Sequence, residues 1–254
     1  MKQLTFTSRA AIGGALALTL AALNPLSAQV VTGVGVGEVS GDDVSLILLG
    51  GAVHPGGLGW KPVASLTGYR VSFPATADEN AEIWALTPAV GLRYRMSTGA
   101  VQAKVGYTFQ SEDREEALGR VFGGGNSGVV TSAQADYWGD GRWGLQAIGA
   151  LNLESEYLWS RGRAMRRVYG WDTGSALAGL DATWQGDIDG SDLNRYRAFQ
   201  IGPVAQWVIN PLGLIVIGGA GIKDDNTIRD ETWYARLELV WSSSLRRRET
   251  VARD

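Results

Sequence analysis

A strict alternation of apolar and polar side chains over residues 101–110 (VQAKVGYTFQ) most constrains what this chain can fold into. The odd positions are apolar, from Val101 to Phe109, and the even positions are polar or small. Side chains two residues apart share one face of a β-strand, so this period predicts a strand with one apolar and one polar face. Lys104 stands in the middle of the polar face. Such a strand needs an apolar medium on one side and water on the other.

The pattern recurs along the chain, and no segment of useful length shows a helical period. We count about twelve strand-like segments, which predicts an all-β fold. They lie near residues 30–38, 43–53, 59–73, 82–97, 100–110, 127–138, 142–153, 157–168, 174–186, 195–209, 212–223 and 231–243.

The N-terminus has the order of a secretory signal peptide. Lys2 and Arg9 precede the apolar run AAIGGALALTLAAL, and LSA follows before Gln29. A charged segment, a short apolar segment and a small-residue cleavage site predict a signal peptide over residues 1–28. Its removal leaves 21 basic and 26 acidic residues. Such a chain carries no global basic surface for nucleic acid.

The connections between the segments fall into two classes that alternate along the chain. One series is mostly longer and acidic, as in PATADENAE, SEDREEALGRVFGGGNS and DDNTIRDE. The other consists mostly of tight turns built on Gly, Asn and Pro, as in HPGGLG, STG, GDG and NPLG. Long loops at one end and short turns at the other are typical of an outer-membrane barrel. An even strand number then places both termini at the periplasmic, short-turn end.

The aromatic residues are sorted in the same way. Those at the long-loop ends of the segments are Trp84, Phe109, Trp184 and Trp233, and those at the short-turn ends are Trp60, Tyr94, Trp138, Trp143, Trp207 and Trp241. Two aromatic belts are expected at the two interfaces of a membrane. The fold predicted from these patterns is a single antiparallel transmembrane β-barrel of about twelve strands.

The alternation also predicts which side chains enter the barrel. The candidate lumen-lining and solute-binding residues are Arg70, Arg93, Arg95, Lys104, Asp136, Arg161, Arg163, Arg236 and Glu238. Asp181 and the polar residues Gln102, Gln134, Gln146, Asn152, Gln200 and Gln206 join them. Two hypotheses fit these residues equally well. The cations line a pore that favours anionic solutes, such as acidic sugars, or Arg–Asp and Arg–Glu pairs fill the interior and hold the barrel shut.

Catalytic and metal-binding motifs are poorly represented. The chain has no cysteine and one histidine, His54, which we expect in a short periplasmic turn. We therefore expect no enzyme activity, no catalytic residue, no metal site and no cofactor, and an outer-membrane lipid-modifying enzyme is the weakest hypothesis. The stretch GVGVGEV resembles a phosphate-binding loop, but no amphipathic helix follows it.

Residues 29–243 resemble the bacterial BcsS family, secreted β-rich proteins associated with cellulose biosynthesis. The segments that carry the resemblance are YLWSRGRA (157–164), RAFQIGPVAQWV (197–208) and GAGIKDDNTIRDETWYARLELVW (219–241). The resemblance implies an accessory role in exopolysaccharide production and offers no catalytic residues. Unlike many outer-membrane barrels, the chain does not end on an aromatic residue, because SSSLRRRETVARD follows Trp241.

Together these observations predict three parts: a signal peptide at 1–28, an outer-membrane barrel at 29–243 and a polar periplasmic tail at 244–254. The expected function is an accessory of exopolysaccharide biosynthesis or export in the bacterial outer membrane. The alternative is a non-conducting structural or interaction barrel. The expected partners are outer-membrane lipid, polysaccharide or a periplasmic export or synthase component, and not nucleic acid.

Overall fold

The computed structural model describes residues 29–74, 80–111, 127–139, 141–188, 197–225 and 231–245. Within these ranges the chain forms twelve strands and one short 3₁₀ helix, Asn210–Leu212. The strands are β1 (Gln29–Ser40), β2 (Ser45–Pro55), β3 (Gly59–Pro74), β4 (Asn80–Arg95), β5 (Gly99–Gln110), β6 (Gly128–Tyr137), β7 (Trp143–Asn152), β8 (Tyr157–Trp171), β9 (Gly174–Asp187), β10 (Arg197–Ile209), β11 (Leu214–Asp225) and β12 (Thr232–Leu245).

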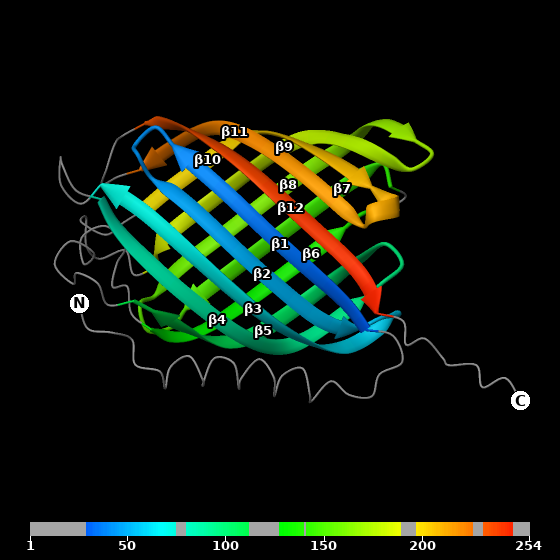
Figure 1. Ribbon diagram of the computed structural model, residues 1–254, viewed down its shortest axis with the longest axis horizontal. Coiled ribbons are helices and arrows are strands. Elements are labelled where there is room, and N and C mark those ends of the chain that lie inside the picture. Colours follow the sequence, from blue (N-terminus) through cyan, green and yellow to red (C-terminus); the bar gives the residue numbers. More distant parts are fainter. Residues whose placement is uncertain are drawn as a thin grey trace, which may run out of the picture.

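The strands form one closed antiparallel barrel in which each pairs with its neighbours in sequence and β1 pairs with β12 (Figure 1). The closing ladder runs from Gln29 opposite Leu245 to Ser40 opposite Tyr234. Closure leaves no edge strand, which lets a β-sheet cross a bilayer with its backbone polar groups satisfied. Among the described residues, no α-helix has the length and hydrophobicity to span a membrane.

The predicted strands agree with the observed ones. Every observed boundary lies within two residues of the expected one, except that β8 continues to Trp171 instead of ending near residue 168. The predicted signal peptide at 1–28 lies outside the described residues. Of the predicted tail at 244–254, the first two positions belong to β12 and the rest also lies outside the described residues.

The two faces of β5 are used as predicted from the alternation. Val101, Val105 and Phe109 are exposed on the outer wall, whereas Gln102 and Lys104 are partly buried inside. Large apolar side chains are exposed in the same way on the other strands, among them Leu49, Leu92, Leu145, Leu180, Ile201, Ile222 and Leu237. An exposed apolar band on this scale is the lipid-facing wall of a membrane barrel.

The interior is not uniform around the barrel. Met165 of β8, Leu177 of β9, Val204 of β10 and Ile217 of β11 form a buried apolar cluster that points inward. A second inward cluster, made by Phe73, Ala81 and Ile83, lies near the ends of β3 and β4 farthest from the termini. The β8–β12 side of the barrel is therefore packed like the core of a soluble protein.

A charge on the outer wall tests this orientation. Val105→Lys places an ammonium group in lipid near the middle of β5, and we expect it to lower the free energy of unfolding by about 2–4 kcal/mol. Reversible guanidinium unfolding in phospholipid vesicles measures the loss. The control is Gln134→Lys, whose side chain faces the lumen beside Asp136. Equal losses for both variants would contradict the assignment of the two faces.

Candidate functional site

Eight of the nine predicted lumen residues point into the barrel. They are Arg93 and Arg95 of β4, Lys104 of β5, Asp136 of β6, Arg161 and Arg163 of β8, and Arg236 and Glu238 of β12. Their contacts with one another or with side chains of other inward faces establish the orientation of seven of them, and Arg95 shares the parity of Arg93. Whether these residues bind a solute stays a prediction.

The prediction was wrong for Arg70, which lies on the outer wall. Its guanidinium forms an ion pair with Glu82 and lies 5.2 Å from the ring centroid of Trp84, which is 56% exposed. The inward positions at this end of β3 are the apolar Val71 and Phe73. Near the end of the strand the usual distribution is therefore reversed, with apolar side chains inside and charged ones outside.

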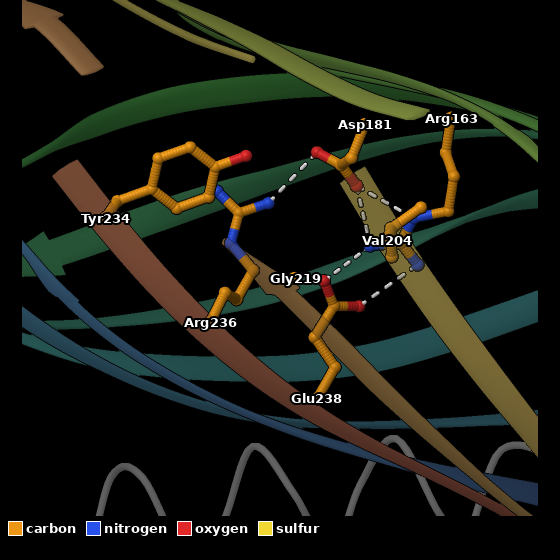
Figure 2. Close-up of a pocket in the computed structure, with 7 residues that line it drawn as sticks. All are labelled: Arg163, Asp181, Val204, Gly219, Tyr234, Arg236 and Glu238. Carbon is orange, nitrogen blue, oxygen red and sulfur yellow. Dashed lines mark hydrogen bonds and ion pairs between the residues drawn. The ribbon is translucent and has the colours of Figure 1, made fainter. Parts of the chain in front are cut away.

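Two arginines of β8 reach across the interior to β12. Arg161 donates from Nη1 to Glu238 Oε1 at 2.8 Å, and Arg163 donates from Nη2 to the same oxygen at 2.6 Å. Arg163 also donates from Nε to Asp181 Oδ2 of β9 at 2.7 Å (Figure 2). These four side chains are 3–8% exposed. Because β9, β10 and β11 lie between β8 and β12, the contacts form a bridge inside the curve of these strands.

Arg236 extends this buried network to the seam between the first and last strands. Its Nε donates to Glu38 Oε2 of β1 at 2.6 Å, and its Nη1 donates to Asp181 Oδ1 at 3.2 Å. A third donor, Nη2, reaches Gln200 Oε1 of β10 at 2.7 Å. The side chains leave a cavity of about 10 Å³, the space of a single water molecule. We call Arg161, Arg163, Arg236, Asp181, Glu238 and Glu38 the arginine bridge.

A chain of amide contacts leads from the arginine bridge to the opposite wall. Arg161 Nη2 donates to Gln146 Oε1 at 3.1 Å, and the Gln146 amide donates to Asp136 at 2.8 Å. Asp136 also accepts from Gln134, whose carbonyl accepts from Gln102 at 2.7 Å. Side chains of β4–β7 on this path are partly exposed within the barrel. Solvent therefore reaches the lumen on the β3–β7 side, which we call the open side.

The open side carries an excess of positive charge. Lys61 of β3 lies directly opposite Arg93 in the β3–β4 ladder, an arrangement that like charges disfavour. Arg93 donates a hydrogen bond to Gln102 at 3.3 Å, and its buried Nε has no hydrogen-bond partner. Lys104 donates a hydrogen bond to Ser65 at 3.2 Å. Within the described part of the chain, neither these three cations nor Arg95 has a carboxylate at ion-pair distance. Lys61 was not among the predicted lumen residues, although its position two residues from Val63 on the inward face of β3 indicates that it faces the lumen.

A second charged cluster lies at the barrel end opposite the termini and was not predicted. Lys223 of β11 donates to Asp42 Oδ2 at 2.5 Å and lies 3.4 Å from Asp225. Asp42 belongs to the β1–β2 turn and also accepts from Ser40. Burial alone would raise the pKa of the Asp42 carboxyl, but the hydrogen bonds from Lys223 and Ser40 hold this pKa below its usual value of 3.8.

The single histidine has a structural setting. The prediction that His54 lies in the turn was wrong, because it belongs to the last part of β2, opposite Val30 of β1. It is buried there, and its Nδ1 donates to the carbonyl of Pro55 at 2.9 Å. Its charged neighbours are Arg93 and Arg95. Nothing in this arrangement pairs it with a serine nucleophile among the described residues. The described residues also contain no group of three His, Asp or Glu side chains placed to hold a metal ion.

Comparison with known proteins identifies the fold of the chain but does not assign it to a family. No family model and no curated protein matches the chain. The COG4313 outer membrane channel from Pseudomonas putida F1 shares 17% identity over 86% of this chain and 96% of that one, with a TM-score of 0.53. The beta domain of the Bordetella autotransporter BrkA shares 11% identity over 85% and 98% of the two chains, with a TM-score of 0.48. The chain therefore has the closed antiparallel fold of bacterial outer-membrane β-barrels.

Removal of one carboxylate tests the arginine bridge. Glu238→Gln removes one of the two carboxylates that Arg161 and Arg163 share, the other being Asp181. Removing one partner of a buried ion pair costs about 3–5 kcal/mol. Guanidinium unfolding in vesicles measures the loss. Glu82→Gln is the matched control, because its pair with Arg70 is exposed and is worth at most about 1 kcal/mol. Similar losses for the two variants would show that the bridge does not stabilise the barrel.

Acid unfolding tests the Lys223–Asp42 contact. Because the folded-state pKa of Asp42 lies below its unfolded-state value, this group stabilises the barrel above pH 3.8, and the contribution disappears as the pH falls through the folded-state pKa. We expect Asp42→Asn to be less stable than the wild type at neutral pH and to approach it in strong acid. Unfolding curves measured across this pH range give the difference. A difference that does not change with pH would contradict the assignment.

Proposed function

We propose that the barrel passes small anionic solutes across the outer membrane along its open side. The observation that carries this proposal is a set of four inward cations, Lys61, Arg93, Arg95 and Lys104. In the described part of the chain none of them has a carboxylate at ion-pair distance, and Asp136 attracts Arg93 only from farther away. A cation-lined constriction with low-dielectric walls raises the local concentration of anions and disfavours cations.

The arginine bridge supports the proposal because its positive and negative charges are equal in number. It contains three arginines and three carboxylates, and each of them has at least one ion-pair partner within the bridge. It therefore adds no net charge to the lumen. The charged side chains that the open side itself presents to the lumen are the four cations and Asp136. Asp136 accepts from two neutral amides rather than from a cation. The balance on the open side is positive.

Single-channel recording tests this function. The refolded protein in a planar bilayer under a KCl gradient should give a reversal potential that reports chloride preference. Arg93→Gln combined with Lys104→Gln should lower the chloride-to-potassium permeability ratio several-fold, because it removes two of the four lumen cations. Arg70→Gln is the control, since it removes the same charge from the outer wall. A folded barrel without current, or an equal effect of the control, would contradict the proposal.

We further propose that this passage serves exopolysaccharide biosynthesis or export. The support is the resemblance of residues 157–164, 197–208 and 219–241 to the BcsS family. In this role the barrel works with a periplasmic export or synthase component and with polysaccharide. Deletion of the gene in its host should lower secreted exopolysaccharide, and the wild-type copy should restore it. Unchanged polysaccharide would contradict this role and leave the proposed anion passage intact.

A second candidate function is a non-conducting structural barrel. It is favoured by the buried arginine bridge and by the apolar cluster of Met165, Leu177, Val204 and Ile217, which fill the β8–β12 side. This alternative predicts a folded protein, confirmed by its heat-dependent gel shift, that carries no ion current. The same recordings therefore decide between the two functions.

A further inference from the structure

A group of uncharged polar and aromatic side chains lines the lumen on β3, β5, β8 and β9, nearer the barrel end opposite the termini. Tyr69 of β3 approaches Gln110 of β5 with 3.5 Å between Oη and Oε1, and Tyr157 of β8 donates from Oη to Gln185 Oε1 of β9 at 3.2 Å. Trp159 shares the inward face of β8 and lies opposite Gln185 in the ladder. All five side chains are partly exposed. We call them the tyrosine–glutamine zone.

The two halves of this zone come from different walls. Tyr69 and Gln110 belong to β3 and β5, whereas Tyr157, Trp159 and Gln185 belong to β8 and β9, and β6 and β7 lie between them. Tyr69 is nevertheless close enough to Tyr157 for the two groups to interact electrostatically. Both Tyr–Gln pairs thus face the same lumen, at the barrel end where the buried carboxylates of Asp187 and Asp225 also interact with Tyr157.

The chemistry of the zone differs from that of the cations deeper in the lumen. A tyrosine hydroxyl and a glutamine amide each offer both a donor and an acceptor, which suits hydroxyl groups rather than charged groups. The rings of Tyr69, Tyr157 and Trp159 add apolar surface beside these polar atoms. Sites that combine aromatic surface with a few directed polar groups are typical of small-molecule binding. A sugar ring presents this combination, with hydroxyl groups at its edge and C–H groups on its faces.

The zone and the cations are separated along the same wall. Gln110 and Lys104 are six residues apart on β5, which corresponds to about 20 Å along the strand. An extended solute can therefore contact both regions at once. We propose that the tyrosine–glutamine zone binds the hydroxyl-bearing rings of an oligosaccharide, and that the preferred solute is an acidic oligosaccharide whose carboxylates meet Lys104 and Arg93. The preference for an acidic solute rests on the proposed passage of anions through the barrel, whereas the binding of sugar rings by the tyrosine–glutamine zone does not.

Binding to the folded protein in detergent micelles tests the inference without requiring ion current. The probes are cellotriose and cellotriouronic acid, which differ only in oxidation at C6, and the readout is calorimetry supported by tryptophan fluorescence. We expect both to bind the wild type, the acid more tightly. Tyr69→Phe combined with Tyr157→Phe removes two hydroxyl groups with little change in packing and should weaken both several-fold. Tyr107→Phe, on the lipid-facing wall of β5, should change neither.

The variants separate this inference from the proposed function. Arg93→Gln with Lys104→Gln should weaken only the acidic trimer, which would support the two-part site. Failure of the wild type to bind either sugar at millimolar concentration, or unchanged binding by the double phenylalanine variant, would overturn the inference even if the bilayer recordings show anion selectivity. Cellotriose binding by a barrel without anion selectivity would support ring binding and overturn the acidic preference.

Discussion

The pairing of β1 with β12 is the constraint on which the rest of the structure depends. A strand in lipid cannot leave its backbone N–H and C=O groups unpaired, so the sheet has to close. Once Gln29 lies opposite Leu245 and Ser40 opposite Tyr234, the sheet is closed, and the side chains along each strand alternate between its outer and inner faces. Apolar side chains then contact lipid and their neighbours enter the lumen, which explains how Lys104 is accommodated in the middle of a strand whose other face is apolar.

The closed sheet places many charged side chains in the interior, where they occur in two different arrangements. On the β8–β12 side, arginines and carboxylates are paired at hydrogen-bonding distance and excluded from water. This arrangement offsets the large cost of taking charges out of water. On the β3–β7 side the cations are partly hydrated and exceed the carboxylates. The first arrangement fills space, and the second produces a field that acts on a solute. The proposed function depends on this difference between the two sides.

Much of the fold could be predicted from the sequence, because the alternation of side chains, the sorting of loops and the aromatic belts all reflect the bilayer. The interior was harder to predict. Arg70 was misplaced because near the outer end of β3 the inward residues Val71 and Phe73 are apolar, so that polarity no longer indicates the lumen. The contacts of Arg161 and Arg163 with Glu238 were not predictable in detail, since strand parity gives the face but not the partner across three intervening strands. The Lys223–Asp42 contact depends in addition on the conformation of the β1–β2 turn, which directs the Asp42 carboxylate into the barrel.

The contact between Arg236 and Glu38 has a consequence for assembly. These residues are direct partners across the seam, and Arg236 also holds Asp181 of β9. Before the first and last strands meet, Glu38 has no guanidinium and Arg236 lacks one of its two carboxylates. Closure of the barrel and completion of the neutral arginine bridge are thus the same event, so that a barrel open at the seam carries an electrostatic penalty that favours pairing of the two ends of the sheet.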